Sequence, residues 1–139
     1  MSSKNKLIKF ITIPTITDDC QLCFAQYPDH MPFKIKRIYF IISPKANEPR
    51  GCHAHRKTRQ VLFCIQGKVR MILDDGKNRE ETILSSPEKG ILLEKMVWHE
   101  MHDMARSTTL IVVASEKYDP ADYIRSYDQF KKLAKAKKK

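Results

Sequence analysis

The sequence predicts an all-β protein, a barrel or a sandwich, with one α-helix at its C-terminus. Residues with β-branched and aromatic side chains gather in short segments that recur roughly every ten residues. Residues that favour turns separate these segments. After residue 119 the apolar pattern changes to a helical period. Regular short strands joined by turns are typical of barrels and sandwiches.

The strands are expected in eight segments, and the connections between them support the assignment. Gln66-Gly67 and residues 74–78 resemble hairpin connections, and residues 85–90 resemble a longer turn. The predicted strands are Leu7–Ile13, Gln21–Gln26, Ile35–Ser43, Gln60–Ile65, Lys68–Asp74, Glu80–Leu84, Ile91–Glu94 and Thr108–Ser115.

The helix is expected to begin at Asp119-Pro120, which combines an N-cap residue with proline at the first helical position. Apolar residues then recur at helical spacing and would form one stripe that packs on the barrel or on a second subunit. This stripe consists of Tyr123, Ile124, Tyr127, Phe130 and Ala134. We expect residues 119–128 to serve structure by holding the helix to the barrel.

The 139 residues and the 42% hydrophobic content indicate a single domain with one core. We assign residues 1–130 to a single domain and residues 131–139 to a lysine-rich tail. The net charge of +10 lies mostly in this tail: without its six lysines, 20 of the 26 basic residues remain against 16 acidic ones. Terminal charge runs are usually solvated extensions. The mildly basic remainder suits a small anionic ligand, and we expect no nucleic-acid partner.

The sequence predicts a cytoplasmic protein with no membrane partner. It contains no run of 18 apolar residues and no signal-peptide pattern at its start. Cys20 and Cys23 form a C-x-x-C, which zinc or redox sites also use. A structural zinc site needs a second close pair, and Cys52 and Cys64 are twelve residues apart. We expect four ordinary reduced thiols.

Two histidines mark a candidate site. In an extended segment, His53 and His55 point to the same face, so their imidazoles can converge on one ligand. Paired neutral imidazoles suit a metal or a proton-transfer site. Two satisfied structural histidines are the alternative interpretation.

The residues that follow resemble the first motif of the cupin superfamily. The spacing H-x-H-x4-Q-x6-G runs from His53 to Gly67, with Gln60 where metal-binding cupins have Glu. Residues 90–102 resemble a degraded second motif, which would add His99 to the same barrel interior. A cage of three histidines and one neutral amide carries no anionic charge and binds divalent metals weakly. We therefore expect no metal, and we interpret the histidines as general acids and bases, each able to contribute roughly 10²- to 10⁴-fold in rate.

A longer set of motifs resembles the dTDP-4-keto-6-deoxy-D-glucose 3,4-ketoisomerases, small enzymes with a cupin-type β-barrel (jelly roll). The resemblance runs collinearly from about Phe33 to Phe130. The matching segments are Phe33–Tyr39, Glu48–Lys57, Gln60–Leu62, Leu73–Gly76, Val97–Met101 and Tyr118–Asp128.

The resemblance implies a reaction that moves a ketone from C4 to C3 of the hexose without metal or cofactor. One of His53 and His55 would move the proton between the two carbons, and the other would relay a proton between the two oxygens through an enediol. Tyr39 would lie near the sugar as a third catalytic group. His99 stands where the family has His or Arg, and His resembles the branch with galacto-configured products, which leads towards a 3-amino-3,6-dideoxyhexose.

The remaining assignments concern binding and assembly. Arg37 and Arg50 are candidates for the pyrophosphate, because guanidinium groups pair with phosphate oxygens in a bidentate manner. Gln60, His99 and Trp98 are further candidates for substrate binding. The resemblance also implies a homodimer with exchanged N-terminal strands, although Thr17-Asp18-Asp19 departs from the family pattern there.

Two alternatives remain. One is another cupin enzyme, such as a sugar-nucleotide epimerase or a metal-dependent oxygenase, for which a tightly bound metal would be evidence. The other is a non-catalytic sugar-binding cupin, which would keep its full function after His53 or His55 is changed to Asn.

Overall fold

The computed structural model describes residues 7–43 and 49–137 of the chain. The first six residues of the predicted domain, Glu48 of the family motif and the last two lysines of the predicted tail lie outside the described residues.

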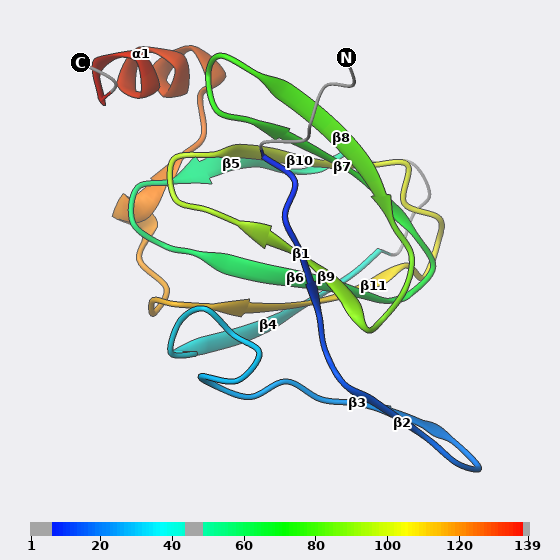
Figure 1. Cartoon of the computed structure of the whole chain (residues 1–139). Helices are drawn as coiled ribbons and strands as arrows, with labels where there is room; N and C mark the ends of the chain where they lie inside the picture. The colour runs from blue at the N-terminus through cyan, green and yellow to red at the C-terminus, as the bar shows by residue number, and fades with distance from the viewer. Residues whose placement is uncertain (1–6, 44–48, 138–139) are drawn as a thin grey trace, which may run out of the picture.

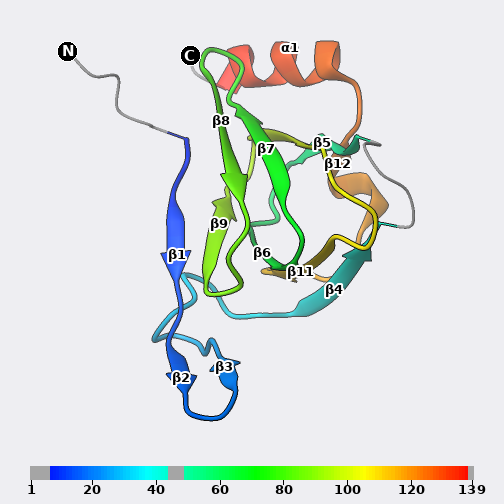
Figure 2. The same cartoon turned by 90° about the vertical axis from the view of Figure 1, so that its right-hand side faces the viewer.

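Two five-stranded antiparallel sheets face each other and form the barrel (Figures 1 and 2). The first sheet has the order β1-β9-β6-β11-β4 and the second has the order β12-β5-β10-β7-β8. The first sheet consists of β1 (Phe10–Thr12), β9 (Lys89–Leu93), β6 (Gln60–Gln66), β11 (Thr109–Ala114) and β4 (Arg37–Ile42). The second consists of β12 (Tyr123–Ile124), β5 (Arg50–His55), β10 (Trp98–His102), β7 (Val69–Asp74) and β8 (Arg79–Leu84). The predicted all-β class with one terminal helix is confirmed.

The core lies between the two sheets, because alternate side chains of each strand point inward. Leu62 and Cys64 of β6 face Met71 and Leu73 of β7 in one buried cluster. On β6 the intervening Val61 and Phe63 belong to a second cluster on the outside of the first sheet. The inward row of β6 ends in a polar residue, Gln60, and this end of the barrel holds the histidines.

Two further elements cover the outer faces. The segment that precedes β4 lays Met31 and Phe33 over Val61 and Phe63. The helix α1 (Tyr127–Lys137) lies over the outer face of the second sheet (Figure 1), where Phe130 and Ala134 pack beside Trp98.

The helix begins later than the sequence predicted. Asp119 caps only a 3₁₀ turn, Pro120–Asp122, by accepting a hydrogen bond from the backbone N–H of Ala121 (3.0 Å). Tyr123 and Ile124 then pair with β5 as strand β12, since the edge of the sheet offers backbone partners that a helix would leave unused. The true N-cap is Ser126, whose hydroxyl accepts a hydrogen bond from the Gln129 N–H (3.2 Å).

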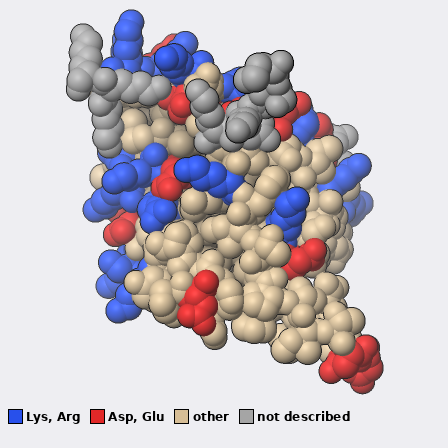
Figure 3. All heavy atoms as spheres, viewed as in Figure 1, with Lys and Arg blue, Asp and Glu red and all other residues tan. Residues whose placement is uncertain are grey.

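Residues 131–137 of the predicted tail continue α1 rather than forming a separate extension. Ala134 is buried against the barrel, whereas Lys131, Lys132 and Lys135 are exposed. On the face that Figure 3 shows, Lys and Arg are interspersed with Asp and Glu. None of the helices in the described residues is long and apolar enough to cross a membrane.

A short hairpin, formed by an early segment of the chain, projects from the barrel (Figures 1 and 2). Its strands β2 (Thr15–Thr17) and β3 (Gln21–Cys23) pair only with each other among the described strands. Ile16 and Leu22 are exposed on it. The strand before the hairpin, β1, pairs with β9 of the same chain.

Candidate active site

The three histidines expected in the site come together at one end of the barrel. β5 and β10 are antiparallel neighbours, and His53 lies directly opposite His99 in their register. The two ring centroids are 4.5 Å apart, and His55 follows on the same face with its ring 4.9 Å from that of His53. The alternation of strand side chains and the antiparallel register together produce this cluster.

Tyr123 completes the row on the other side of β5. In the pairing of β12 with β5 it lies opposite His55, and the two ring centroids are 4.5 Å apart. Its ring is also 4.9 Å from that of His53. The sequence placed Tyr123 on a helical stripe, so its position at the histidines was missed.

Asp122 is the second residue that the sequence interpretation missed. Its carboxylate accepts hydrogen bonds from the Lys57 N–H (2.7 Å) and from the Thr58 hydroxyl, and it contacts His55 Nδ1 at 2.9 Å. The segment 119–128 was expected to serve structure alone. Asp122 was part of the family motif, but nothing in the chain order indicates a partner 67 residues away.

Burial keeps all three histidines neutral at neutral pH. Desolvation, followed by the neighbouring His55, lowers the pKa of His53 from 6.5 to about 3. Desolvation also lowers the pKa of His55, against the opposing effect of Asp122, and it lowers the pKa of the fully buried His99 well below 6.5. A neutral imidazole can accept a proton, so the cluster is a set of bases.

Tyr39 and Gln60 face this cluster from the first sheet. The Tyr39 hydroxyl donates a hydrogen bond to Gln60 Oε1, and burial raises the pKa of the phenol well above its ordinary value. The tyrosine therefore stays protonated and acts as a donor. Five buried atoms around the site have no hydrogen-bond partner among the described residues: Arg37 Nε, His53 Nε2, His55 Nε2, Gln60 Nε2 and His99 Nδ1. Buried polar atoms are rarely left unpaired, so this group indicates a polar ligand.

A cavity of about 510 Å³ opens beside the cluster. Tyr39, His53 and Tyr123 line it together with two arginines, Arg50 and Arg125. This volume is in the ordinary range for small-molecule sites. Arg37 does not line the cavity: its guanidinium lies 5.2 Å from the ring centroid of Tyr39 and 5.7 Å from that of Tyr118.

The structure does not bring Trp98 to the site. Adjacent residues of a strand point to opposite faces, so Trp98 points outward where His99 points inward. Its ring packs 5.8 Å from that of Phe130, and its Nε1 donates to Glu100 (2.7 Å). Trp98 anchors α1, and its prediction as a substrate contact is corrected accordingly.

The three imidazoles could hold a divalent cation, although without the carboxylate that metal-binding cupins have at the position of Gln60. One ring nitrogen from each of His53, His55 and His99 lies within 4.8 Å of the others, which is close enough for shared coordination. These ligands carry no charge, and Gln60 has its amide oxygen engaged by Tyr39. Three neutral histidines also form catalytic zinc sites, so the donor set by itself is compatible with a metal.

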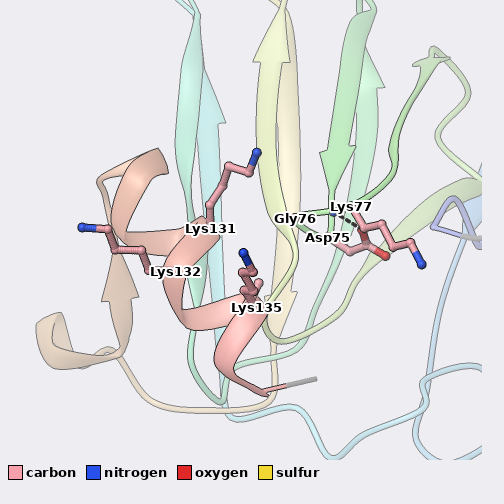
Figure 4. Close-up of a pocket in the computed structure, with 7 residues that line it drawn as sticks. Asp75, Gly76, Lys77, Lys131, Lys132 and Lys135 are labelled. Carbon is pink, nitrogen blue, oxygen red and sulfur yellow. Dashed lines mark hydrogen bonds between the residues drawn. The ribbon is translucent and has the colours of Figure 1, made fainter. Parts of the chain in front are cut away.

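A second hollow, of about 490 Å³, lies between α1 and the β7–β8 turn (Figure 4). Lys131, Lys132 and Lys135 of the helix and Lys77 of the turn line it. The Asp75 carboxylate there accepts hydrogen bonds from the turn backbone. Among the described residues no histidine lines this hollow, so the histidine cluster is the candidate active site.

Comparisons with known proteins support this assignment. The family model described as FdtA (WxcM-like, C-terminal) matches residues 3–135. The chain is 46% identical over 129 residues to the TDP-4-oxo-6-deoxy-alpha-D-glucose-3,4-oxoisomerase of Aneurinibacillus thermoaerophilus, which covers 93% of this chain and 91% of that protein.

Two solved structures are similar over almost the whole chain. QdtA, a sugar 3,4-ketoisomerase from Thermoanaerobacterium thermosaccharolyticum in complex with TDP, has a TM-score of 0.90 at 34% identity and covers 95% of this chain and 97% of that chain. The TDP-quinovose 3,4-ketoisomerase WlaRB from Campylobacter jejuni has a TM-score of 0.86 at 39% identity, covering 92% and 99%.

The cupin-type barrel and its relatives over almost the whole chain define the class of the protein, an isomerase. The chain belongs to the FdtA family of sugar 3,4-ketoisomerases.

Proposed function

We propose that the protein converts TDP-4-keto-6-deoxyglucose into a TDP-3-keto-6-deoxyhexose. The observation that carries the proposal is the cluster of three neutral histidines beside Tyr39, at a cavity lined by Arg50 and Arg125. The relatives' names support the substrate class, and a variant of the Thermoanaerobacterium enzyme is described in complex with TDP-4-keto-6-deoxyglucose.

The reaction moves one hydrogen from C3 to C4 and another from O3 to O4, and it needs no external oxidant. A base removes the proton from C3, and the electron pair of that bond forms the C3–C4 double bond while O4 takes up a proton. The resulting enediol then loses the proton on O3, a carbonyl forms at C3, and C4 receives a proton. One hydrogen leaves each of C3 and O3, and one arrives at each of C4 and O4, so atoms and electrons balance.

His53 and His55 supply the acid–base groups for these steps. Both are neutral at neutral pH because burial lowers their pKa values, so either can accept a proton from carbon or oxygen. One serves the carbons and the other serves the oxygens. Tyr39 stays protonated and donates its hydroxyl hydrogen to Gln60 Oε1, so its oxygen can accept a hydrogen bond from a sugar hydroxyl.

The arginines of the cavity bind the diphosphate. Arg50 and Arg125 line the cavity, and guanidinium groups pair with phosphate oxygens through two parallel hydrogen bonds. Arg37 packs against Tyr39, with its guanidinium 5.2 Å from the ring centroid. Its buried Nε has no hydrogen-bond partner among the described residues.

His99 directs the configuration at C4 towards the galacto product. Its ring lies 4.5 Å from that of His53, so it shares the place where C4 would be protonated. A galacto product would feed the synthesis of a 3-amino-3,6-dideoxyhexose. In this proposal the protein acts in the cytoplasm, as the sequence predicts.

The protein forms a homodimer in this proposal. Ile38, Phe40 and Ile42 alternate along the edge strand β4 and are 58%, 61% and 65% exposed, which is unusual for a monomer surface. Since β1 pairs within its own chain, the projecting β2–β3 hairpin is the N-terminal element that a partner subunit would receive.

Proton NMR of TDP-4-keto-6-deoxyglucose incubated with EDTA-treated protein tests the function. We expect a 3-keto sugar whose H4 couplings report a galacto configuration. A gluco product would overturn the role of His99 alone. An unchanged sugar in the presence of folded protein that binds TDP would overturn the proposed function and favour a sugar-binding cupin, and a change of configuration without movement of the ketone would favour an epimerase.

A further inference from the structure

Asp122 has a buried carboxylate with three hydrogen-bond partners, Lys57, Thr58 and His55. It is 4% exposed. The Lys57 N–H donates to Oδ1 at 2.7 Å, while the Thr58 hydroxyl and His55 Nδ1 both contact Oδ2. A backbone N–H can only donate, so Oδ1 is an acceptor.

The protonation of this group follows from its partners. Burial by itself would raise the pKa of Asp122, but the hydrogen bonds from Thr58, Lys57 and His55 outweigh it and hold that pKa below its ordinary value. An ionised carboxylate has no proton to give, so the contact with His55 requires a hydrogen on Nδ1. In a neutral imidazole the other nitrogen, Nε2, then carries a lone pair and is the basic atom.

The fold builds this arrangement from two segments that are tied together at several points. Asp122 ends the 3₁₀ turn, and its carbonyl accepts from the Arg56 N–H at 2.8 Å. The next residue, Tyr123, pairs with His55 across β12 and β5. The carboxylate therefore has little freedom to leave the imidazole, and His55 Nε2 is buried without a partner among the described residues.

We propose that Asp122, held by Thr58 and the Lys57 amide, is a positioning residue that keeps His55 in the Nδ1–H tautomer and so makes Nε2 a base of the histidine cluster. The effect on rate rests on the proposed ketoisomerase function, whereas the tautomer is a property of the protein alone. Asp122 touches no reacting atom in this account and acts through His55.

Asp122→Asn gives the sharpest test because it preserves shape and reverses the two hydrogen bonds at the Oδ2 position, those with His55 and Thr58. With its carbonyl oxygen on the Lys57 N–H, the new amide nitrogen faces His55 Nδ1 and can only donate to it. His55 must then place its hydrogen on Nε2, which removes the base. Errors of tautomer at catalytic histidines cost roughly 10⁴-fold in kcat in serine proteases, and we expect a loss of about 10²- to 10⁴-fold here.

The experiment combines ¹⁵N–¹H correlation NMR of the histidine rings with steady-state kinetics on the sugar nucleotide and titration with TDP. We expect the Nδ1–H tautomer at His55 in the unmodified protein and the Nε2–H tautomer in Asp122→Asn, with kcat reduced and TDP affinity within about twofold. Asp74→Asn is the matched control: Asp74 is 3% exposed and binds Arg79 and Tyr127 beneath α1, so its loss should change neither tautomer nor kcat.

An Nε2–H tautomer in the unmodified protein would overturn the proposal, as would an unchanged tautomer and kcat in Asp122→Asn. If Asp122→Asn does not fold, Thr58→Val tests the same clamp: it should lower kcat with TDP affinity kept, and Thr58→Ser should recover most of that loss. Equal kcat in the two Thr58 variants would contradict a role of the Thr58 hydroxyl in holding the Asp122 carboxylate. Failure of the unmodified protein to convert the sugar would instead count against the proposed function, because the tautomer measurement does not depend on turnover.

Discussion

At the scale of single residues, the site depends on keeping imidazoles free of protons without removing their ability to accept one. His53 achieves this through burial and through its neighbour His55, and its pKa falls to about 3. His55 is buried as well, but the Asp122 carboxylate opposes the fall in its pKa. Two histidines two residues apart are therefore chemically different, which suits the separate carbon and oxygen proton transfers of the proposed reaction.

Replacing either histidine should remove catalysis and spare binding. In His53→Asn or His55→Asn we expect kcat to fall at least ~10²-fold, because one acid–base group is lost, while TDP affinity stays nearly unchanged. Steady-state kinetics and TDP titration measure the two effects. His102→Asn is the control. His102 forms a hydrogen bond with Glu100 on the same strand, β10, so this variant should keep the kcat of the unmodified protein. Normal turnover in both active-site variants would contradict the acid–base roles.

At the scale of secondary-structure elements, the sequence predicted the strands that their own residues and the flanking turns indicate. The eight predicted strands all correspond to observed strands, with boundaries that differ by a few residues. Four observed strands, β2, β5, β10 and β12, were not predicted. β10 was missed because Trp98–His102 contains no β-branched side chain, and it forms by pairing with β5 and β7. The start of α1 was predicted too early because the pairing of β12 with β5 overrides the Asp119-Pro120 helix signal.

The residues of the candidate site also divide into those with local sequence evidence and those that depend on pairing between distant segments. His53 and His55 were predictable from their spacing along one strand. Asp122 and Tyr123 reach the histidines only because β12 adds to the edge of β5, so no local pattern reveals them. Trp98 was misplaced because its segment was not predicted as a strand, and in a strand the direct neighbour of His99 points to the opposite face.

The anchoring of α1 can be tested separately from catalysis. Phe130 of α1 is fully buried in a cluster with Trp98, Ala54 and Ile124 of the second sheet, so Phe130→Ala should lower the free energy of unfolding by about 3–5 kcal/mol. Chemical denaturation measures this loss. The exposed Lys131 is one residue away, and Lys131→Ala should change stability by less than about 0.5 kcal/mol. Equal stabilities of the two variants would show that the helix does not pack as described.

At the scale of the whole molecule, the histidine cluster ties stability to pH. Histidines whose pKa is lowered in the folded state bind protons only in the unfolded chain between their folded values and about 6.5. The stability that these neutral histidines contribute is therefore fully present above pH 6.5. It is lost as the pH falls towards 3, the pKa of His53 in the folded protein.

Each such histidine contributes a slope of up to about 1.4 kcal/mol per pH unit within this window. Denaturant titrations at pH 7, 6 and 5 measure the slope. It should become shallower in His53→Asn, because one titrating group is removed. A free energy of unfolding that does not change from pH 7 to 5, or an equal slope in the variant, would contradict the buried neutral state.

The proposed homodimer is also a property of the whole molecule. Phe40→Asp places a charge at the centre of the apolar row on β4 and should convert the dimer to a monomer, which light scattering after gel filtration detects. Ile83→Asp changes an equally exposed apolar residue on β8 and should leave the dimer intact. A monomeric unmodified protein, or a dimeric Phe40→Asp variant, would contradict this surface as the interface.

The central claim is that the ketone moves by proton transfer through an enediol, and isotope exchange tests it most directly. The EDTA-treated protein is incubated with TDP-4-keto-6-deoxyglucose in D₂O and followed by NMR beyond equilibrium. A protonated imidazole exchanges its hydrogen with solvent, so repeated forward and reverse turnovers should bring deuterium to C4 of the product and to C3 of the remaining substrate. Full retention of protium at both carbons after equilibrium would instead indicate direct hydride migration and contradict the histidine mechanism.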